Sequence, residues 1–185
     1  VQHVHKYDAK FFLLSDDDFV LGSKIGLKRV FDFCELIVES KNNGTIPEDI
    51  GFYCQTRIDV FMTRTDKNEK VVNWELIDAM KAAGFCSFGI GVETFSDRLL
   101  AAPSMNKRFI NERDSCIVLD ALLQRGLSPT INIILGIPET TVEEIIHSME
   151  VAVEFFKKGC QISVTGLMDS FPGAIIHGHK DYPIT

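Results

Sequence analysis

Charged side chains stand directly after short apolar runs in this sequence, and their types suit ligand binding. Asp16, Asp17 and Asp18 follow one such run. Arg57 ends a second run, and Glu93 ends a third. Carboxylates accept hydrogen bonds from ammonium groups and hydroxyls, and a guanidinium pairs with a carboxylate through two parallel hydrogen bonds. Because an unpaired charge that faces the interior of a folded protein is costly, we expect Arg57 and Glu93 to have partners or a ligand.

Two further apolar runs also end in residues with polar or special backbone character. Gly136 and Glu139 follow the fourth run, and Asp169 follows the fifth. Polar residues in such places also begin loops and cap helices, which is an ordinary structural role for any one of them. Five runs that all end in this way favour a common site over five separate caps.

The elements that must position these residues alternate between strands and helices. Five short runs rich in β-branched or aromatic residues are predicted to be strands, at 11–16, 52–57, 87–93, 130–136 and 161–167. Four amphipathic stretches are predicted to be helices, at 25–43, 73–83, 109–125 and 141–158. Each stretch precedes a glycine that can adopt the left-handed, helix-terminating conformation, namely Gly44, Gly84, Gly126 and Gly159. This alternation predicts an α/β fold in which helices lie outside a parallel sheet.

The order of these elements predicts a partial parallel (βα) barrel similar to a TIM barrel, with about five strands present. The carboxyl ends of the strands in such a barrel lie on one rim, so the charged residues should converge there. Residues 1–8 look like the end of a further helix, so we expect the first strand of the core to be missing. Residues 1–185 then form a single domain that is truncated at its N-terminus.

Composition narrows the possible functions. The chain has 19 lysines and arginines against 26 aspartates and glutamates, a net charge of −7 that disfavours direct nucleic-acid binding. No apolar run approaches the ~18 residues of a membrane span and no signal peptide is evident, so we expect a cytoplasmic protein without a membrane partner. The five cysteines are expected to be reduced and mostly buried. Two His-x-His pairs near the chain ends are interpreted as solvated, so no metal site is expected in this chain.

In their order and spacing, these segments resemble the radical S-adenosylmethionine (SAM) enzymes, in the branch whose members often carry a cobalamin-binding region. The resemblance rests on residues 12–19, 56–59, 83–85, 89–94, 134–140 and 171–173, together with Lys107 and Gly126. It implies an enzyme that reductively cleaves SAM at a [4Fe–4S] cluster and generates a 5′-deoxyadenosyl radical to modify a small-molecule substrate. It also implies an electron donor such as flavodoxin or ferredoxin and, in the parent protein, cobalamin. The barrel would orient these groups and exclude water.

The resemblance assigns roles at the methionine end of SAM. Asp16 and Asp17 occupy the place of the stretch that binds the methionine amino group, where acidic side chains accept ammonium hydrogens. Glu93 would accept hydrogen bonds from the ribose hydroxyls or from the methionine amine. Arg57 would meet a carboxylate of SAM or of the substrate, because its fork suits a carboxylate.

The resemblance also points to an adenine site. The stretch from Ile134 through Gly136 to Glu139 matches the family's adenine-contacting pattern, although Asn132 stands where the first glycine is usual. Gly136 would let the backbone approach the ring. A capping role for Glu139 at the start of the next helix is weighed equally with ligand binding.

The sequence departs from the family at one important point. The CxxxCxxC loop, whose thiolates hold the cluster, is absent from these residues. Cysteines twenty or more positions apart hold a cluster only if the fold gathers them, and Cys54 lies inside a predicted strand. We therefore expect the cluster ligands to lie outside this chain and the chain alone to be inactive. The cobalamin signature Asp-x-His-x-x-Gly is absent too.

Two alternatives stay open. Asp16 and Asp18 after an apolar strand resemble the aspartate pair of haloacid dehalogenase-like phosphatases, in which one carboxylate attacks phosphorus and Mg²⁺ shields the charge. That interpretation leaves Arg57, Glu93 and residues 136–139 unexplained. The second alternative is a non-catalytic, degenerate barrel that keeps a nucleotide-shaped groove and has lost the cluster loop.

Overall fold

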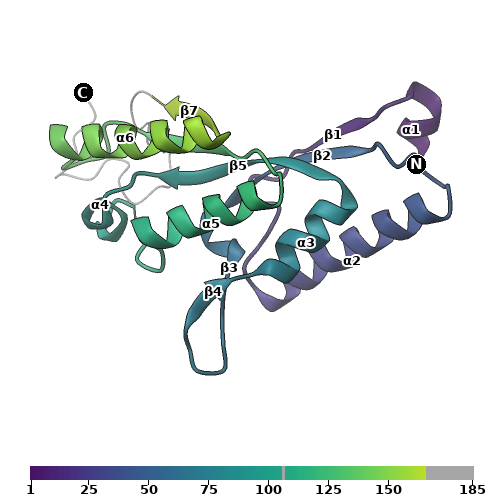
Figure 1. Ribbon diagram of the computed structural model, residues 1–185, viewed down its shortest axis with the longest axis horizontal. Helices are drawn as coiled ribbons and strands as arrows, with labels where there is room; N and C mark the ends of the chain where they lie inside the picture. The colour runs from purple at the N-terminus through teal and green to yellow at the C-terminus, as the bar shows by residue number, and fades with distance from the viewer. Residues whose placement is uncertain (106, 166–185) are drawn as a thin grey trace.

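A five-stranded parallel sheet forms the framework of the molecule (Figure 1). The structure is a computed structural model, and it describes residues 1–105 and 107–165. The strands run in the order β1-β2-β5-β6-β7. Their bounds are β1 Phe11–Leu14, β2 Gly51–Arg57, β5 Phe85–Glu93, β6 Thr130–Ile134 and β7 Gln161–Thr165. All five predicted strands are present and parallel, which confirms the predicted α/β fold.

Helices occupy the connections between the strands. Their bounds are α1 Gln2–Tyr7, α2 Lys24–Asn42, α3 Trp74–Ala83, α4 Asp97–Ala101, α5 Glu112–Gln124 and α6 Val142–Lys158. The four predicted helices correspond to α2, α3, α5 and α6, and α1 confirms the helical end expected within residues 1–8. The short helix α4 is not predicted, because a single turn carries too little periodicity to be recognised from sequence.

The four predicted glycine stops take the left-handed conformation. Gly84 and Gly159 are the C-caps of α3 and α6, with φ of 107° and 115°. Gly44 and Gly126 lie one residue beyond the C-caps of α2 and α5, with φ of 73° and 68°. Glycine carries no Cβ penalty in this region, so these positions end the helices where the chain must turn back to the sheet.

A small antiparallel hairpin, absent from the predictions, lies between β2 and α3. The 3-10 helix η1 (Ile58–Phe61) leads into β3 (Met62–Arg64), which pairs with β4 (Lys70–Val72). Figure 1 shows that the hairpin projects away from the main sheet. Each strand has three residues, which is too short for an alternating pattern to be read from sequence.

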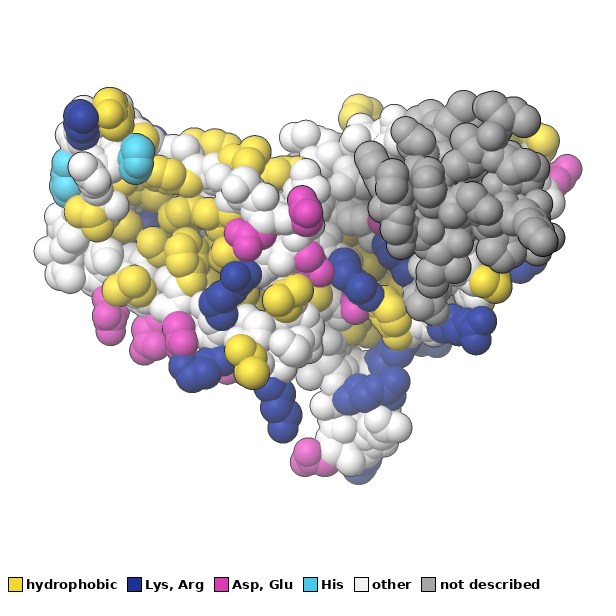
Figure 2. All heavy atoms as spheres, turned by 180° about the vertical axis from the view of Figure 1, so that it is seen from behind, with side chains coloured by type: hydrophobic (Ala, Val, Ile, Leu, Met, Phe, Trp, Pro, Cys, Tyr) yellow, Lys and Arg dark blue, Asp and Glu magenta, His cyan; other side chains and the backbone are white. Residues whose placement is uncertain are grey.

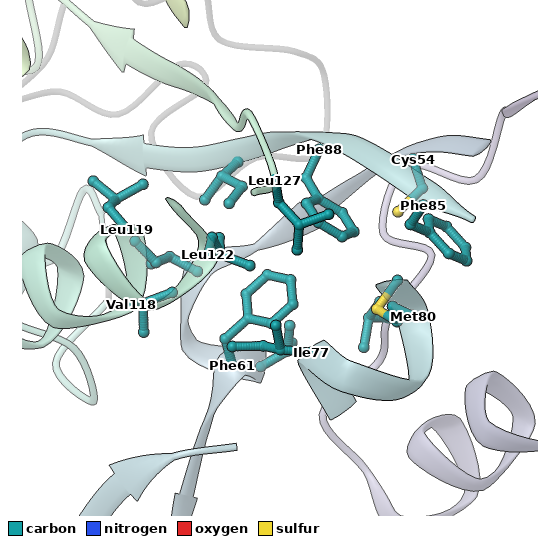
Figure 3. Packing of buried hydrophobic residues seen from close by; sticks show 14 of the residues in the cluster. Cys54, Phe61, Ile77, Met80, Phe85, Phe88, Val118, Leu119, Leu122 and Leu127 are labelled. Carbon is teal, nitrogen blue, oxygen red and sulfur yellow. The ribbon is translucent and has the colours of Figure 1, made fainter. Parts of the chain in front are cut away.

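The buried core lies between one face of the sheet and helices α3 and α5 (Figure 3). The rings of Phe85 and Phe88 stack with centroids 5.9 Å apart, and Phe61 meets Phe88 edge-on at 5.4 Å. Met80 of α3 and Leu122 of α5 are fully buried in the same cluster. Burying one such apolar side chain contributes roughly 1.5–3 kcal/mol, so this face of the sheet is held against its helices.

The opposite face of the sheet, here called the inner face, carries small and polar residues. Side chains alternate along a strand, so the residues between the buried ones point away from the core. The inner face is formed by Tyr53, Gln55 and Arg57 of β2, Ser87, Gly89 and Gly91 of β5, and Asn132 and Ile134 of β6. Helices cover one face and polar residues the other, as in the wall of a parallel barrel.

Strand β1 forms one edge of the sheet. Phe11 and Leu13 of β1 are exposed, and an apolar groove of about 410 Å³ lies between α1, β1 and α2. Figure 2 shows hydrophobic side chains gathered at this end of the molecule, beside the histidines of α1. The expectation that the core has a further strand, and with it the truncated domain boundary, stays a prediction.

Some expectations need correction or lie outside the described residues. Cys34, Cys54 and Cys160 are buried as expected, but Cys86 is exposed and Cys116 is half-buried, because their positions fall between the core-facing residues of β5 and α5. Asp169, residues 166–167 of the last predicted strand and residues 171–173 lie outside the described part of the chain. In the described part, no helix is long and apolar enough to cross a membrane.

Candidate functional site

The carboxyl ends of the strands bring the candidate residues to one rim of the sheet. Arg57 at the end of β2 is directly paired with Gly91 of β5, and Gly91 is paired with Asn132 of β6. Ile134 at the end of β6 is paired with Thr165 at the end of β7. Residues that are far apart in sequence are therefore neighbours on this rim, as the barrel interpretation requires.

Glu93 reaches the inner face through an irregularity at the end of β5. The register with β6 shifts between Gly91 and Glu93, and Glu93 has a left-handed φ of 71°. A Cβ added to Gly91 would lie 2.5 Å from Glu93 Oε1, so the carboxylate occupies the space over that glycine. Bulges re-aim side chains near active sites, and a non-glycine residue in this backbone region is held there by its surroundings.

Lys107 is the partner of Glu93. Its Nζ donates to Glu93 Oε1 at 2.8 Å and to the carbonyl oxygen of Gly91 at 3.2 Å. The lysine and glutamate side chains are 17% and 16% exposed, so this ion pair is largely shielded from water. A pair taken out of water in this way depends on both members being present. The expectation that Glu93 has a partner is confirmed.

Arg57 also has partners. Its Nε donates to Asp59 Oδ1 at 2.9 Å, and its guanidinium carbon lies 4.6 Å from the centroid of the Phe109 ring. The arginine side chain is 44% exposed, so the ion pair contributes little to stability. Asp59 and Phe109 instead orient the guanidinium at the rim, beside Gly91.

The three consecutive aspartates have different surroundings. Asp18 Oδ1 accepts a hydrogen bond from the Thr56 hydroxyl at 3.2 Å, and burial raises the pKa of Asp18 although that hydrogen bond acts in the opposite direction. Asp16 lies 3.6 Å from a guanidinium nitrogen of Arg29. Asp17 is exposed. Of the three, Asp18 is the one bonded to β2, whereas the sequence interpretation stressed Asp16 and Asp17.

The turn after β6 has an unusual backbone. Gly136 and Glu139 both adopt left-handed conformations, with φ of 69° and 68°. The N-cap of α6 is Thr141, which forms a capping box with Glu144. The capping role considered for Glu139 therefore belongs to Thr141, because it precedes the first helical residue and its hydroxyl accepts from the N3 amide.

Sequence reasoning missed several neighbours of the candidate residues. Lys107 is part of the resemblance to radical SAM enzymes, but the sequence assigns it no role, and its spacing from Glu93 does not reveal the ion pair. Tyr53 places its hydroxyl where a Cβ of Gly89 would be, so that glycine is required by a cross-strand contact. Arg98 contacts the turn after β6. Contacts between separate elements of this kind leave no periodic signal in the sequence.

The described residues do not fit an iron–sulfur cluster. Among them, no group of three or more His, Cys, Asp or Glu side chains is arranged to hold a metal ion. Burial raises the pKa of both Cys34 and Cys54 to about 12, which keeps them as thiols, whereas cluster ligands are thiolates. That the cluster ligands lie outside this chain stays a prediction.

A comparison with models of protein families shows which family this chain belongs to. A family model described as the radical SAM superfamily matches residues 6–152. The chain belongs to this superfamily. The match includes Asp16, Arg57, Glu93 and Gly136, so all segments of the resemblance except residues 171–173 lie inside the radical SAM region. No curated protein matches the chain at a significant level.

Solved structures share the fold of this radical SAM chain. The radical SAM methyltransferase TsrM from Kitasatospora setae, with cobalamin and a [4Fe–4S] cluster bound, has a TM-score of 0.66 at 13% identity and covers 88% of this chain. TsrM with tryptophan substrate and a SAM analogue has a TM-score of 0.67 at 13% identity and 89% coverage. Coproporphyrinogen III oxidase (HemN) from Escherichia coli, a radical SAM enzyme, has a TM-score of 0.52 at 19% identity and 77% coverage.

This chain spans under a third of the length of each of those structures, at 29%, 28% and 28%. The likeness confirms the partial, TIM-like parallel barrel of the radical SAM family. Neither the phosphatase nor the degenerate binding module finds support in these comparisons. That the rim residues contact one bound ligand stays a prediction.

Proposed function

We propose that this chain binds SAM at the carboxyl rim of its inner face and forms much of the SAM-binding barrel of a radical SAM enzyme. The observation that supports the proposal most strongly is the shielded pair of Glu93 and Lys107 over Gly91, next to Arg57. A [4Fe–4S] cluster with ligands outside this chain would supply one electron for the cleavage of SAM into methionine and a 5′-deoxyadenosyl radical.

The charges at the rim complement those of the methionine end. SAM carries a cationic ammonium group and an anionic carboxylate in its methionine part. Asp16 and Asp17 are acidic and exposed at the end of β1, so they suit the ammonium group. The oriented guanidinium of Arg57 suits a carboxylate of SAM or of the substrate. Glu93 accepts hydrogen bonds from the ribose hydroxyls or from the amine.

The adenine ring would lie against the turn after β6. Ile134 is half-buried on the inner face and offers an apolar contact, while Gly136 lets the backbone approach the flat ring. Glu139, which also has a left-handed backbone, is the last residue of this proposed adenine-binding turn. With Asn132 on the same face, this surface combines apolar and hydrogen-bonding groups, as small-molecule sites commonly do.

The whole protein would act on a small-molecule substrate and receive electrons from a donor such as flavodoxin or ferredoxin. Cobalamin belongs to this proposal as a further cofactor of the parent protein, since the solved structure of TsrM has cobalamin bound. A cytoplasmic location would suit oxygen-sensitive chemistry. Direct binding to nucleic acid is not expected of a chain with a net charge of −7.

The test uses a reading frame that contains this chain together with a CxxxCxxC loop. The protein is expressed anaerobically, reconstituted with iron and sulfide, reduced with dithionite and supplied with SAM. Formation of 5′-deoxyadenosine is the expected result, and Glu93→Gln should reduce it. If a frame with the CxxxCxxC loop forms no 5′-deoxyadenosine and instead releases phosphate from phosphomonoesters with Mg²⁺, the phosphatase alternative is correct.

A further inference from the structure

The two helices that follow β5 and β6, α4 and α6, are joined by one arginine and one glutamate. Arg98 of α4 follows the end of β5, and Glu144 of α6 follows the turn after β6. Arg98 donates to both carboxylate oxygens of Glu144, with Nε to Oε1 at 2.9 Å and a terminal nitrogen to Oε2 at 2.6 Å. This two-point geometry fixes the relative orientation of the two side chains.

Glu144 is bonded from three directions. Besides Arg98, its carboxylate accepts from the Ser96 hydroxyl at 2.6 Å and from the Thr141 backbone amide at 3.0 Å. Its side chain is 17% exposed. These hydrogen bonds favour the ionised form, and the contact with Arg98 is the main reason that the pKa of Glu144 falls to about 2. The carboxylate is therefore charged and held at physiological pH.

Arg98 makes one further contact, with the backbone of the turn itself. The nitrogen that meets Glu144 also donates to the carbonyl oxygen of Glu139 at 2.7 Å. Glu139 and Gly136 are the two left-handed residues of this turn. A single guanidinium thus holds the strained end of the turn and the first turn of α6 together.

We propose that Arg98 and Glu144 form a clamp that holds residues 136–139 in the conformation that receives adenine, at a fixed position relative to Glu93. Arg98 is then a positioning residue that acts through the turn. The inference rests on the proposed function, since adenine is the ligand assigned to the turn.

The attachment of α6 to the end of β5 does not depend on the clamp alone. Ser148 of α6 already bonds to the Thr94 hydroxyl at 3.1 Å and to the Phe95 amide at 3.0 Å, and all three residues are buried. Arg98 is 51% exposed, so its ion pair adds less to this attachment than an equally short pair would add in the interior. Removing Arg98 should therefore loosen the turn while α6 stays attached to β5.

The clamp can be tested with Arg98→Ala and the milder Arg98→Lys, which keeps the charge but loses the planar fork. The matched control is Arg125→Ala. Arg125 also pairs with a carboxylate through two nitrogens, that of Asp78, but it follows the end of α5 and does not touch the turn. All variants are made in the longer reading frame that carries this chain. Two measurements are made: hydrogen exchange of the amides of residues 136, 137 and 139–141 without ligand, and the kinetics of SAM cleavage.

Arg98→Ala should speed exchange at residues 136, 137 and 139–141 and raise KM for SAM about tenfold with little change in kcat, since a displaced binding group weakens ligand positioning. Arg98→Lys should lie between Arg98→Ala and the unmodified enzyme, and Arg125→Ala should match the unmodified enzyme. Unchanged exchange in Arg98→Ala, or an unchanged KM, would overturn the clamp. If the unmodified enzyme fails to cleave SAM, the proposed function fails, while exchange still reports whether Arg98 holds the turn.

Discussion

Lys107 bonds two acceptors at the end of β5, the Glu93 carboxylate and the Gly91 carbonyl. Glu93 needs this partner because its carboxylate lies folded over the sheet and largely away from water. The glycine, the bulge and the lysine together determine where one carboxylate points. At the scale of single residues, the candidate site therefore depends on Gly91, which leaves space for the Glu93 carboxylate, and on Lys107, which pairs with that carboxylate.

Lys107→Met should destabilise the protein by about 1–3 kcal/mol, because it leaves the Glu93 carboxylate shielded from water without its partner. Urea unfolding measures the loss. Lys157→Met is the matched control, since Lys157 pairs with Glu154 where both side chains are about two-thirds exposed, at 64% and 65%. Its effect should stay within about 0.5 kcal/mol. Equal losses in the two variants would show that the Glu93 pair is not special.

Gly91→Ala should weaken SAM binding in the longer frame, because its Cβ would lie 2.5 Å from Glu93 Oε1 and displace the carboxylate. Equilibrium dialysis with SAM gives the affinity, with an expected loss of about tenfold. Gly22→Ala serves as the control, since its Cβ would meet only Val60 Cγ1 at 4.0 Å. An affinity unaltered by Gly91→Ala would remove Glu93 from the SAM site.

At the scale of elements, helix α6 begins with a complete capping box that is bonded to helix α4. Thr141 accepts from the Glu144 amide, while the Glu144 carboxylate accepts from the Thr141 amide and pairs with Arg98 of α4. The start of α6 is therefore joined to the segment after β5 by charge as well as by packing. A helix N-terminus also favours this negative charge through its dipole.

Stability should depend on pH through Glu144. Its pKa falls from the usual 4.5 to about 2 in the folded protein, chiefly because of Arg98, so its contribution is present above 4.5 and is lost as pH falls toward 2. Thermal unfolding between pH 5 and about 2 should show this loss, and Glu144→Gln should reduce the slope. Glu143→Gln, on an exposed neighbour in α6, should retain it. If Glu144→Gln keeps the full slope, other carboxylates are responsible.

At the scale of the whole molecule, the chain provides one wall of a barrel, and its described residues provide no ligand set for a cluster. Five parallel strands place the polar inner face on one side and the helices on the other. The described cysteines are dispersed over α2, α5, two strands and the residue before β7, and no group of metal-binding side chains forms among the described residues. Cluster chemistry would therefore require thiolates from outside this chain.

This gives a simple expectation for metal loading. The chain of 185 residues, treated anaerobically with iron and sulfide and then desalted, should show no visible absorbance of a [4Fe–4S] cluster. A longer frame that includes the CxxxCxxC loop should show the absorbance of the cluster under the same treatment. A stable cluster on the 185-residue chain would mean that its own cysteines gather as ligands, contrary to the raised pKa of Cys34 and Cys54.

The sequence alone was sufficient for features that are encoded locally. The strands containing Arg57 and Glu93, the helices that end near Gly84 and Gly159, and the order of motifs all follow from short-range patterns. Backbone preferences and side-chain periodicity act over a few residues, so they can be read along the chain. The family resemblance likewise depends on linear motifs.

Other features exist only once distant segments meet. Lys107 bonds to Glu93, Arg98 bonds to Glu144 and to the carbonyl of Glu139, and the cap of α6 belongs to Thr141. The sequence placed acidic and basic residues near the rim, but it did not specify which would pair. Pairing depends on three-dimensional distance and on exclusion of water, and these are properties of the packed sheet and helices rather than of any local stretch of chain.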